Sequence, residues 1–472
     1  GYSTATIGLV ATLASLAGGI IAFPASAASD RVGRRVVFFA GFFDASAFKS
    51  RIAGEVKGFD VTAYLAPKEA RRMDVFIHYG MAAGIQAIKD SGLAVTADNA
   101  DRIGVNIGSG IGGLPMIEDT HNDFLSGGSR KISPFFIPGT IINMISGNLS
   151  IMFGLKGPNL AIVTACTTGL HAIGTSFRMI QYGDADAMVC GGAESTVTPL
   201  AIGGFASAQA LSTRNDDPAT ASRPWDTGRD GFVLGEGAGV LVLEEYEHAK
   251  KRGARIYAEV AGFGMSGDAF HMTAPDTDGP RRSMINALRD AEINADQVQY
   301  LNAHGTSTPL GDKNETDAIK LAFGDVARNL VINSTKSMTG HLLGAAGGAE
   351  SGLAPADIGY INAHGTATIV GDVTECEAIR AVFGDAAARI PVSSTKSMHG
   401  HLLGGAGGLE SALTVLAVHH QISPPTINIF EQDPECDLDY CANMARQIKI
   451  DVALKNNFGF GGTNGTLAFR RV

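Results

Sequence analysis

The chain has 472 residues, of which 45% are hydrophobic and 18% are charged. This length and balance predict a globular protein of more than one domain and exclude a disordered chain, a collagen and a small disulfide scaffold. The net charge of −10 argues against nucleic-acid binding, which needs a basic surface. The 60 glycines indicate tight turns, and the five cysteines, which form no CxxC pair, indicate a reducing, cytoplasmic environment.

The beginning of the chain has the character of a leader. Residues 7–23 are almost wholly apolar or small, and Pro24-Ala-Ser-Ala-Ala follows them, which is typical of a signal-peptide cleavage site. The segment lacks the basic residues of a signal peptide, and its glycines suit a membrane span poorly. We therefore assign residues 1–30 to a signal-like or foreign leader and expect no membrane association of the remainder.

Short apolar runs bounded by glycine alternate with helical patterns along the remainder, which predicts α/β layering. Buried strands are expected at residues 102–107, 160–164, 187–190, 240–243 and 256–260. Helices are expected at residues 74–90, 168–182 and 282–292. Gly253 and the strand after it indicate a boundary between an N-terminal half, residues 31–252, and a C-terminal half, residues 253–472.

Cys166 is the candidate nucleophile. It lies between the strand predicted at residues 160–164 and the helix predicted at residues 168–182, on a sharp turn of small residues. The helix dipole and the unpaired N–H groups at a helix start favour a thiolate, and a strand-to-helix turn is a known setting for a nucleophile. The alternative is a buried, inert thiol, which is the usual state of a free cysteine. Cys190, inside an apolar run, is expected to be such a core residue.

The segment at residues 300–351 is repeated at residues 360–411 with most positions unchanged. Each copy has an Asn-Ala-His-Gly-Thr motif at the end of a short apolar strand and a Lys-Ser-Met-x-Gly-His motif before a helix rich in glycine and alanine. The candidate site residues are His304, Lys336 and His341 in the first copy and His364, Lys396 and His401 in the second. A lone histidine is usually structural, but a repeated set indicates chemistry. The spacing matches no zinc site, so no metal is predicted.

Two glycine-rich loops have competing interpretations. Residues 456–464, Asn-Asn-Phe-Gly-Phe-Gly-Gly-Thr-Asn, are either a plain hairpin turn or a loop whose backbone N–H groups line an oxyanion hole. Residues 108–113 lack the GxGxxG spacing and the acidic residue of a dinucleotide site, so no nicotinamide cofactor is expected.

Five motifs occur in order along the chain: TACTTG, PWDTGRDGFVLGEGAGVLVLEEYEHAKKRGA, NAHGT, STKSM(T/H)GHLLG and NFGFGGTN. With them the chain resembles, from about residue 43 onward, the β-ketoacyl-[acyl carrier protein] synthases of the thiolase-like superfamily, and in TACTTGLHAIG the synthase II group. The resemblance implies two similar βαβαβαββ halves in five α/β/α/β/α layers, a homodimer and no cofactor. It also implies a decarboxylative Claisen condensation in fatty acid elongation, in which malonyl-[acyl carrier protein] loses CO₂ and attacks a cysteine-bound acyl chain.

The resemblance also assigns roles to residues. Cys166 is the nucleophile, the two histidines of one copy hydrogen-bond the malonyl thioester oxygen, and the lysine of that copy is the active-site lysine. Backbone N–H groups of Cys166 and Phe460 hold the oxyanion, and Phe460 gates the acyl pocket against Ile111. The residues expected to contact substrate are Ile111, Phe458, Thr366 and Thr368. The acidic carrier protein is expected to dock on Lys68, Arg71, Arg72, Arg130 and Lys131. The alternative interpretation of the first three is that they only form the solvated face of a helix.

The chain departs from the family in two ways. Its first strand and helix are truncated, and the duplication supplies two sets of site residues, each with two histidines and one lysine, where the fold has room for one set. If the first set is used, Pro355 interrupts the helix after His341, at a cost of about 3 kcal/mol. If the second is used, the first copy lengthens a loop, at about 0.6 kcal/mol per doubling. We therefore expect His364, Lys396 and His401 to form the site. The alternatives are an inactive chain that binds carrier protein and a Cys-His hydrolase.

Overall fold

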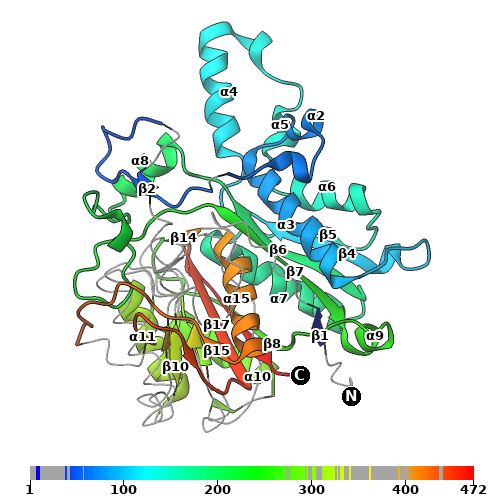
Figure 1. Cartoon of the computed structure of the whole chain (residues 1–472), viewed down its shortest axis with the longest axis vertical. Helices are drawn as coiled ribbons and strands as arrows, with labels where there is room; N and C mark the ends of the chain where they lie inside the picture. Colours follow the sequence, from blue (N-terminus) through cyan, green and yellow to red (C-terminus); the bar gives the residue numbers. More distant parts are fainter. Residues whose placement is uncertain are drawn as a thin grey trace.

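The computed structural model (Figure 1) describes residues 7–10, 38–39, 43–56, 58–272, 276–292, 294–295, 300–304, 311–324, 327, 330–333, 340–341, 361–362, 392–393, 401–402, 405–434 and 440–472. Ten strands form one sheet in the order β10-β9-β17-β18-β8-β1-β7-β6-β4-β5. Their bounds are β1 Ile7–Val10, β4 Ile103–Gly108, β5 Asn159–Leu160, β6 Ala187–Glu194, β7 Gly237–Glu245, β8 Ala258–Gly267, β9 Tyr300–Asn302, β10 Val331–Asn333, β17 Val452–Gly459 and β18 Thr463–Arg470.

The sheet consists of two halves with the same topology. From the centre outward, one half has the order β1-β7-β6-β4-β5 and the other has the order β8-β18-β17-β9-β10. In each half the first two neighbours pair antiparallel and the last two pair parallel. The halves meet where β1 pairs antiparallel with β8. The repeated order confirms the two similar halves that the sequence predicted.

Helices complete the five layers. Helices α7 and α15 lie between the two half-sheets, α3 and α6 cover the outer face of the N-terminal half, and α10 with α11 covers that of the C-terminal half (Figure 1). Each half thus follows the pattern βαβαβαββ along the chain. The helix bounds are α2 Pro67–Ala70, α3 Val75–Ser91, α4 Leu114–Gly127, α5 Phe136–Thr140, α6 Met144–Phe153, α7 Thr168–Gln181, α8 Pro199–Ser207, α9 Tyr246–Lys251, α10 Asp278–Asp290, α11 Gly311–Phe323 and α15 Ala406–His420.

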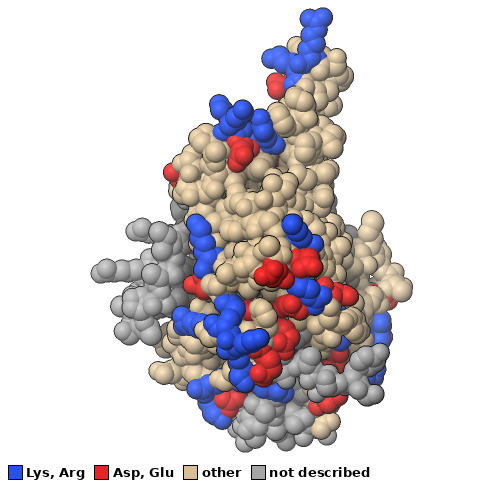
Figure 2. Space-filling view, turned by 90° about the vertical axis from the view of Figure 1, so that its right-hand side faces the viewer, with Lys and Arg blue, Asp and Glu red and all other residues tan. Residues whose placement is uncertain are grey.

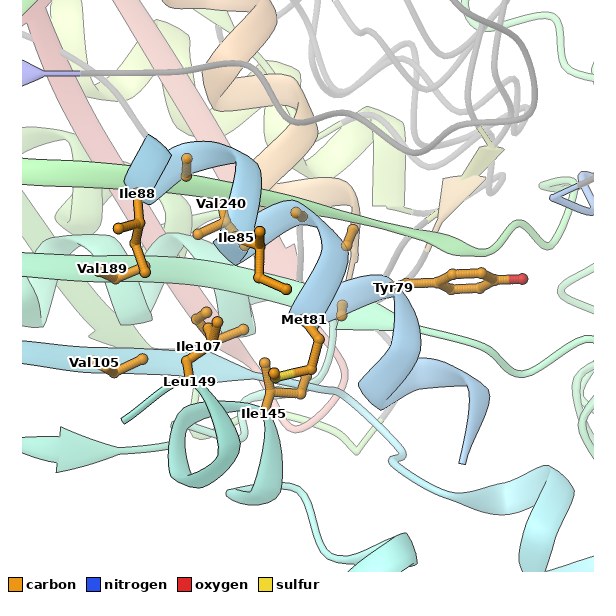
Figure 3. Packing of buried hydrophobic residues seen from close by; sticks show 14 of the residues in the cluster. Tyr79, Met81, Ile85, Ile88, Val105, Ile107, Ile145, Leu149, Val189 and Val240 are labelled. Atoms are coloured by element: carbon orange, nitrogen blue, oxygen red, sulfur yellow. The ribbon is translucent and has the colours of Figure 1, made fainter. Parts of the chain in front are cut away.

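The outer helix α3 is held on its half-sheet by an apolar core (Figure 3). Ile85 of α3 belongs to one buried cluster with Val105 of β4 and Val189 of β6. Gly84 lets α6 approach closely, because a Cβ at this position would lie 2.4 Å from Cδ1 of Leu149. Any larger residue at position 84 would therefore require the Leu149 side chain to move.

Most predicted elements are present, with one correction. Helices α3 and α7 agree with the predicted ranges within one residue at each end, and β4, β6, β7 and β8 contain or overlap the predicted strands. Helix α10 begins at Asp278, where the side chains of Arg281 and Arg282 donate to the Asp278 carboxylate and stabilise an earlier turn. The buried strand predicted at residues 160–164 is wrong. Strand β5 contains only Asn159–Leu160, at the edge of the sheet, and both residues are exposed.

The apolar run near the beginning of the chain contributes a strand. Ile7–Val10, which the sequence pattern placed in a leader, forms β1 between β7 and β8. Strand β1 takes the position of the first strand of the N-terminal half. The sequence indicated that this first strand is truncated. In the part of the chain that the structure describes, no helix is long and apolar enough to cross a membrane.

The two copies of the duplicated segment contribute different elements. Strands β9 and β10 and helix α11 come from the first copy, and helix α15 comes from the second. The second copy's strands β12 (Ile361–Asn362) and β13 (Val392–Ser393) repeat the parallel register of β9 and β10 but form a separate two-stranded sheet. Only one strand can pair with this edge of β17, and β9 occupies it.

The C-terminal half is therefore assembled from both copies, whereas the sequence favoured the second copy throughout. The segments before the helix, β11 (Gly340–His341) and β14 (His401–Leu402), pair parallel with each other. Four further short strands form two antiparallel pairs outside the main sheet: β2 (Phe38–Phe39) with β3 (Ile52–Ala53), and β15 (Ile422–Ser423) with β16 (Arg446–Gln447).

Candidate active site

Cys166 lies on a sharp turn that leads into helix α7. The turn is the 3-10 segment Ala165–Thr167, in which Ala165 has a φ of 48°, a left-handed conformation that residues with a side chain rarely adopt. Helix α7 begins at Thr168, so the thiol lies at the helix start, where N–H groups and the helix dipole favour an anion. Cys166 is buried, with 2% of its surface exposed. The structure thus has the sharp turn into a helix that the sequence predicted for this residue, although the strand before it ends at Leu160.

Helix α7 holds this turn through His171, a residue that no motif had singled out. Its Nδ1 lies 2.9 Å from Oγ1 of Thr164, and its Nε2 lies 3.2 Å from the carbonyl oxygen of Asn464. A carbonyl oxygen only accepts, so Nε2 carries the proton and Nδ1 accepts from the threonine hydroxyl. Burial lowers the pKa of His171 to about 4, which keeps the ring neutral at pH 7. The ring ties the segment before Cys166 to strand β18.

Replacing His171 by glutamine should reduce the loss of stability at acidic pH. The pKa of His171 is about 4 in the folded protein against an ordinary value of 6.5, so the unfolded chain binds this proton first as the pH falls. The contribution of His171 to the free energy of unfolding is complete above pH 6.5. Below this pH it falls by about 1.4 kcal/mol per pH unit, which gives a loss of about 3 kcal/mol at pH 4. Urea unfolding of both proteins across this pH range measures the difference.

Other buried groups do not obscure this comparison. Burial raises the pKa of Glu194 and of Glu236 to about 7, but both carboxyl groups titrate in the wild type and in the variant alike. The difference between the two stability curves therefore isolates His171. Parallel curves between pH 6.5 and pH 4 would contradict the assignment of a neutral, buried ring.

His304 of the first copy lies beside strand β17. It is buried, it follows β9, and its backbone N–H donates to Oε1 of Glu315 in α11 over 2.6 Å. Its Nδ1 lies 3.3 Å from Nδ2 of Asn457, and its ring packs edge-on against Phe458 with the ring centroids 5.3 Å apart. An amide NH₂ group donates, so Nδ1 is the acceptor and a neutral ring carries its proton on Nε2.

The turn with Cys166 and the ring of His304 each contact the end of β17. Gly459 is the last residue of β17, and a Cβ there would lie 2.9 Å from Oγ1 of Thr167, the residue after the thiol. Phe458, which contacts His304, immediately precedes Gly459. The fold therefore brings the candidate nucleophile of one half and a histidine of the other half to the same hairpin.

The glycine-rich loop at residues 456–464 forms the hairpin between β17 and β18. Phe460 lies at its tip and is 36% exposed, and Gly461 and Gly462 both have positive φ angles, which glycine adopts without strain. The ring of Phe460 lies 6.5 Å from that of Phe205 in α8. The gating role that the resemblance implies for Phe460 stays a prediction.

A buried carboxylate organises the loop that carries Ile111. Glu194, at the end of β6, accepts hydrogen bonds from the N–H groups of Gly110 at 2.7 Å and Ile111 at 3.1 Å and from the hydroxyl of Ser109 at 2.8 Å. Burial raises the pKa of Glu194 to about 7, against these hydrogen bonds, which lower it. Ile111 itself is 37% exposed. No sequence motif pointed to Glu194, because its partners lie far from it in the chain.

Several predicted site residues lie outside the described part of the chain. These are Lys336, His364, Thr366, Thr368 and Lys396. For His341 and His401 the structure gives the backbone, in the paired strands β11 and β14, and β14 precedes α15. Among the residues that the structure describes, no three His, Cys, Asp or Glu side chains form a cluster that could hold a metal ion.

The basic residues expected to bind carrier protein lie in two groups. The first group is Lys68 in α2 together with Arg71 and Arg72, which directly follow that helix. The second group is Arg130 and Lys131 in the 3-10 turn Ser129–Lys131 after α4. Figure 2 shows Lys and Arg side chains gathered at the tip of the protruding end and again below it. The guanidinium of Arg72 stacks on the ring of Phe135 at 4.3 Å, so this residue also has a structural contact.

Comparison with known protein families gives matches along most of the chain. The model of the β-ketoacyl synthase N-terminal domain matches residues 40–249. The model of the β-ketoacyl synthase C-terminal domain matches twice, at residues 257–351 and 349–430, so both copies of the duplicated segment are recognised.

Individual proteins are similar over nearly the same length. The chain is 52% identical over 432 residues to 3-oxoacyl-[acyl-carrier-protein] synthase 2 of Vibrio harveyi and 51% identical to the protein of that name from Coxiella burnetii, each match covering 91% of the chain and 90% of the relative. A β-ketoacyl synthase from Burkholderia phymatum STM815 superposes with a TM-score of 0.76 at 32% identity, covering 99% of this chain and 98% of that one. The ketosynthase AntDE, solved in complex with the acyl carrier protein AntF, gives 0.73 at 28% identity and the same coverage.

Proposed function

The chain belongs to the β-ketoacyl synthase family, and on that premise we propose that it condenses malonyl-[acyl carrier protein] with an acyl chain bound to Cys166, as a 3-oxoacyl-[acyl carrier protein] synthase of fatty acid elongation. The observation that carries the proposal is that the turn beside Cys166 and the ring of His304 contact neighbouring residues at the end of β17, Gly459 and Phe458. A cytoplasmic location suits the described cysteines, Cys166, Cys190 and Cys441, which are buried free thiols.

The reaction needs a nucleophile and then hydrogen-bond donors. Cys166 attacks the acyl thioester, the bond from the acyl carbon to the carrier sulfur breaks, and the carrier leaves as its thiol. Malonyl-carrier then loses CO₂, and the electron pair left behind forms an enolate whose oxygen is stabilised by N–H donors. The enolate carbon attacks the acyl-cysteine, and the thiolate of Cys166 leaves. A neutral His304 with its proton on Nε2 suits the donor role, because it stabilises the enolate without protonating it early.

We propose that the site draws on both copies of the duplicated segment. Cys166 is the nucleophile, His304 comes from the first copy, and Lys396 and His401 come from the second. The support is that β9, which leads to His304, has the position beside β17, and that α15, which begins at Ala406 after His401, is the helix of the second copy.

Sequential exposure to the two carrier-bound substrates tests the function. With acyl-[acyl carrier protein], mass spectrometry should detect an acyl adduct on Cys166. Subsequent malonyl-[acyl carrier protein] should then release CO₂ and a 3-oxoacyl product extended by one acetate unit. Absence of the adduct would favour the second candidate, an inactive chain that binds carrier protein, which the surplus copy supports. Rapid release of free fatty acid would favour a hydrolase.

Acyl carrier protein is the proposed partner, and exchanging Lys68 and Arg71 for glutamate should weaken its docking. Both side chains are exposed, and Arg72 is left unchanged because it stacks on Phe135. We expect the KM for acyl-[acyl carrier protein] to rise about tenfold at low salt and less at high salt, since docking of opposite charges is screened.

The acyl-pantetheine thioester provides the control substrate, because it lacks the protein part of the carrier. Its KM should not change in the same variant. Glutamate at Lys250 and Lys251 of α9 gives a matched change of charge elsewhere and should leave both substrates unaffected. Equal losses with both substrates in the α2 variant would count against a docking role.

We also propose a homodimer. Strand β5 is an exposed edge of the sheet, and the preceding helix α6 exposes Ile151 (79%) and Met152 (43%). An unpaired strand edge beside exposed apolar side chains is a surface that another chain can cover. A second copy of this chain would extend the sheet through β5 and bury these side chains.

A further inference from the structure

A buried ion pair joins strand β17 to helix α15. Nζ of Lys455 lies 2.6 Å from Oε2 of Glu410, and neither side chain is exposed to solvent. The ammonium also donates to the backbone carbonyl oxygen of Asn456 over 2.8 Å. Burying two charges costs desolvation free energy, and two apolar side chains of the same size would stabilise the fold at least as well. The pair is therefore not explained by core packing alone.

Side chains of β17 alternate between the two faces of the sheet. Asn456 points to the outer layer, where its amide contacts helix α10. Lys455 and Asn457 share the opposite, inner face: Lys455 reaches Glu410 of α15, and Asn457 reaches Nδ1 of His304. One face of this strand therefore contacts both the histidine of the proposed site and the helix that follows the second histidine motif.

Helix α15 is also held from the side of the N-terminal half. A Cβ on Gly408 would lie 1.7 Å from the carbonyl oxygen of Gly239 in β7, so helix and strand touch backbone to backbone. This contact sets the separation of α15 from β7. The ion pair two residues later sets its position relative to β17. Because His401 lies five residues before Ala406, the first residue of α15, we expect a shift of the helix to move His401 relative to His304.

We infer that Lys455 is a positioning residue of the proposed condensing site. Its ion pair with Glu410 fastens α15, and with it the segment carrying His401, to the strand that orients His304. Lys455 acts through these groups and touches no reacting atom. The inference rests on the proposed function, because it concerns the alignment of two imidazoles for malonyl decarboxylation. Acylation of Cys166 does not depend on this alignment.

Lys455→Met tests the inference, since methionine keeps an unbranched apolar stem and removes the ammonium. We expect kcat for malonyl decarboxylation to fall about tenfold or more with little change in KM, because misplaced donors affect the transition state rather than binding. The rate of acyl adduct formation on Cys166 should stay within about twofold of the wild type. A merely structural role would slow both steps together.

A double variant guards against misfolding. Lys455→Met combined with Glu410→Met leaves no unpaired buried charge, so it should unfold at a temperature close to that of the wild type, and its decarboxylation should still be slow. Exchanging the two charges, Lys455→Glu with Glu410→Lys, should restore part of the rate. Wild-type decarboxylation in the folded double variant would overturn the inference.

Two further measurements separate the possible failures. Arg229→Met breaks another buried ion pair, in which Nη1 of Arg229 lies 2.8 Å from Oδ2 of Asp433, and should change acylation and decarboxylation in equal proportion. A wild-type protein that forms no adduct and releases no CO₂ would overturn the proposed function itself. An active wild type whose Lys455→Met variant loses both steps equally would overturn only the positioning role.

Discussion

Replacing Cys166 by alanine should abolish condensation and leave malonyl decarboxylation in place. Without the thiol no acyl chain is held, and loss of a covalent nucleophile lowers the rate about 10⁴-fold or more. Decarboxylation requires N–H donors at the enolate oxygen, which the variant keeps. Mass spectrometry of the acyl adduct and release of CO₂ from malonyl-[acyl carrier protein], measured on the same preparation, separate the two steps.

Cys190→Ala is the matched control. Cys190 is fully buried in β6, as its apolar surroundings predicted, and burial raises the pKa of its thiol to about 12, so it is not a nucleophile at neutral pH. This variant should condense at the wild-type rate. An adduct that persists in Cys166→Ala and is lost in Cys190→Ala would reverse the assignment.

His304→Ala should lower malonyl decarboxylation, and condensation with it, by about 10²- to 10³-fold, the usual effect of removing one preorganised donor. Acylation of Cys166 should change far less. His364→Ala, the same substitution in the second copy, should have no measurable effect, because β9 and not β12 pairs with β17. Rates of CO₂ release from malonyl-[acyl carrier protein] provide the comparison.

The opposite pattern, with activity lost in His364→Ala alone, would show that the second copy supplies both histidines. Equal losses in the two variants would contradict a single site assembled from both copies. His401→Ala and His341→Ala extend the same comparison to the helix side, where we expect His401 to be required because α15 belongs to its copy.

Local patterns were sufficient to predict α/β layering, whereas the two similar halves and the five layers were implied by the family resemblance. Strands and helices follow from the spacing of apolar residues, which is a property of neighbouring positions, and their alternation predicted the layers that the structure shows. The turn at Cys166 was predictable from the small residues and the helix signal that are adjacent in the chain, whereas the strand predicted at residues 160–164 ends at Leu160.

Long-range contacts were not predictable in this way. His171 bonds to the carbonyl oxygen of Asn464, and Lys455 pairs with Glu410, in each case across elements that only the folded chain brings together. The position of β5 at the edge of the sheet likewise depends on the fold as a whole and not on its own residues.

The sequence alone determined the α/β layering, the candidate nucleophile and the two sets of histidine motifs, since each depends on a short run of residues. Only the tertiary structure decided that Ile7–Val10 completes the sheet and that β9 of the first copy and α15 of the second are used together. The physical reason is that a strand position beside β17 accepts one partner. Two similar segments therefore compete for it, and the outcome depends on their contacts with the rest of the fold.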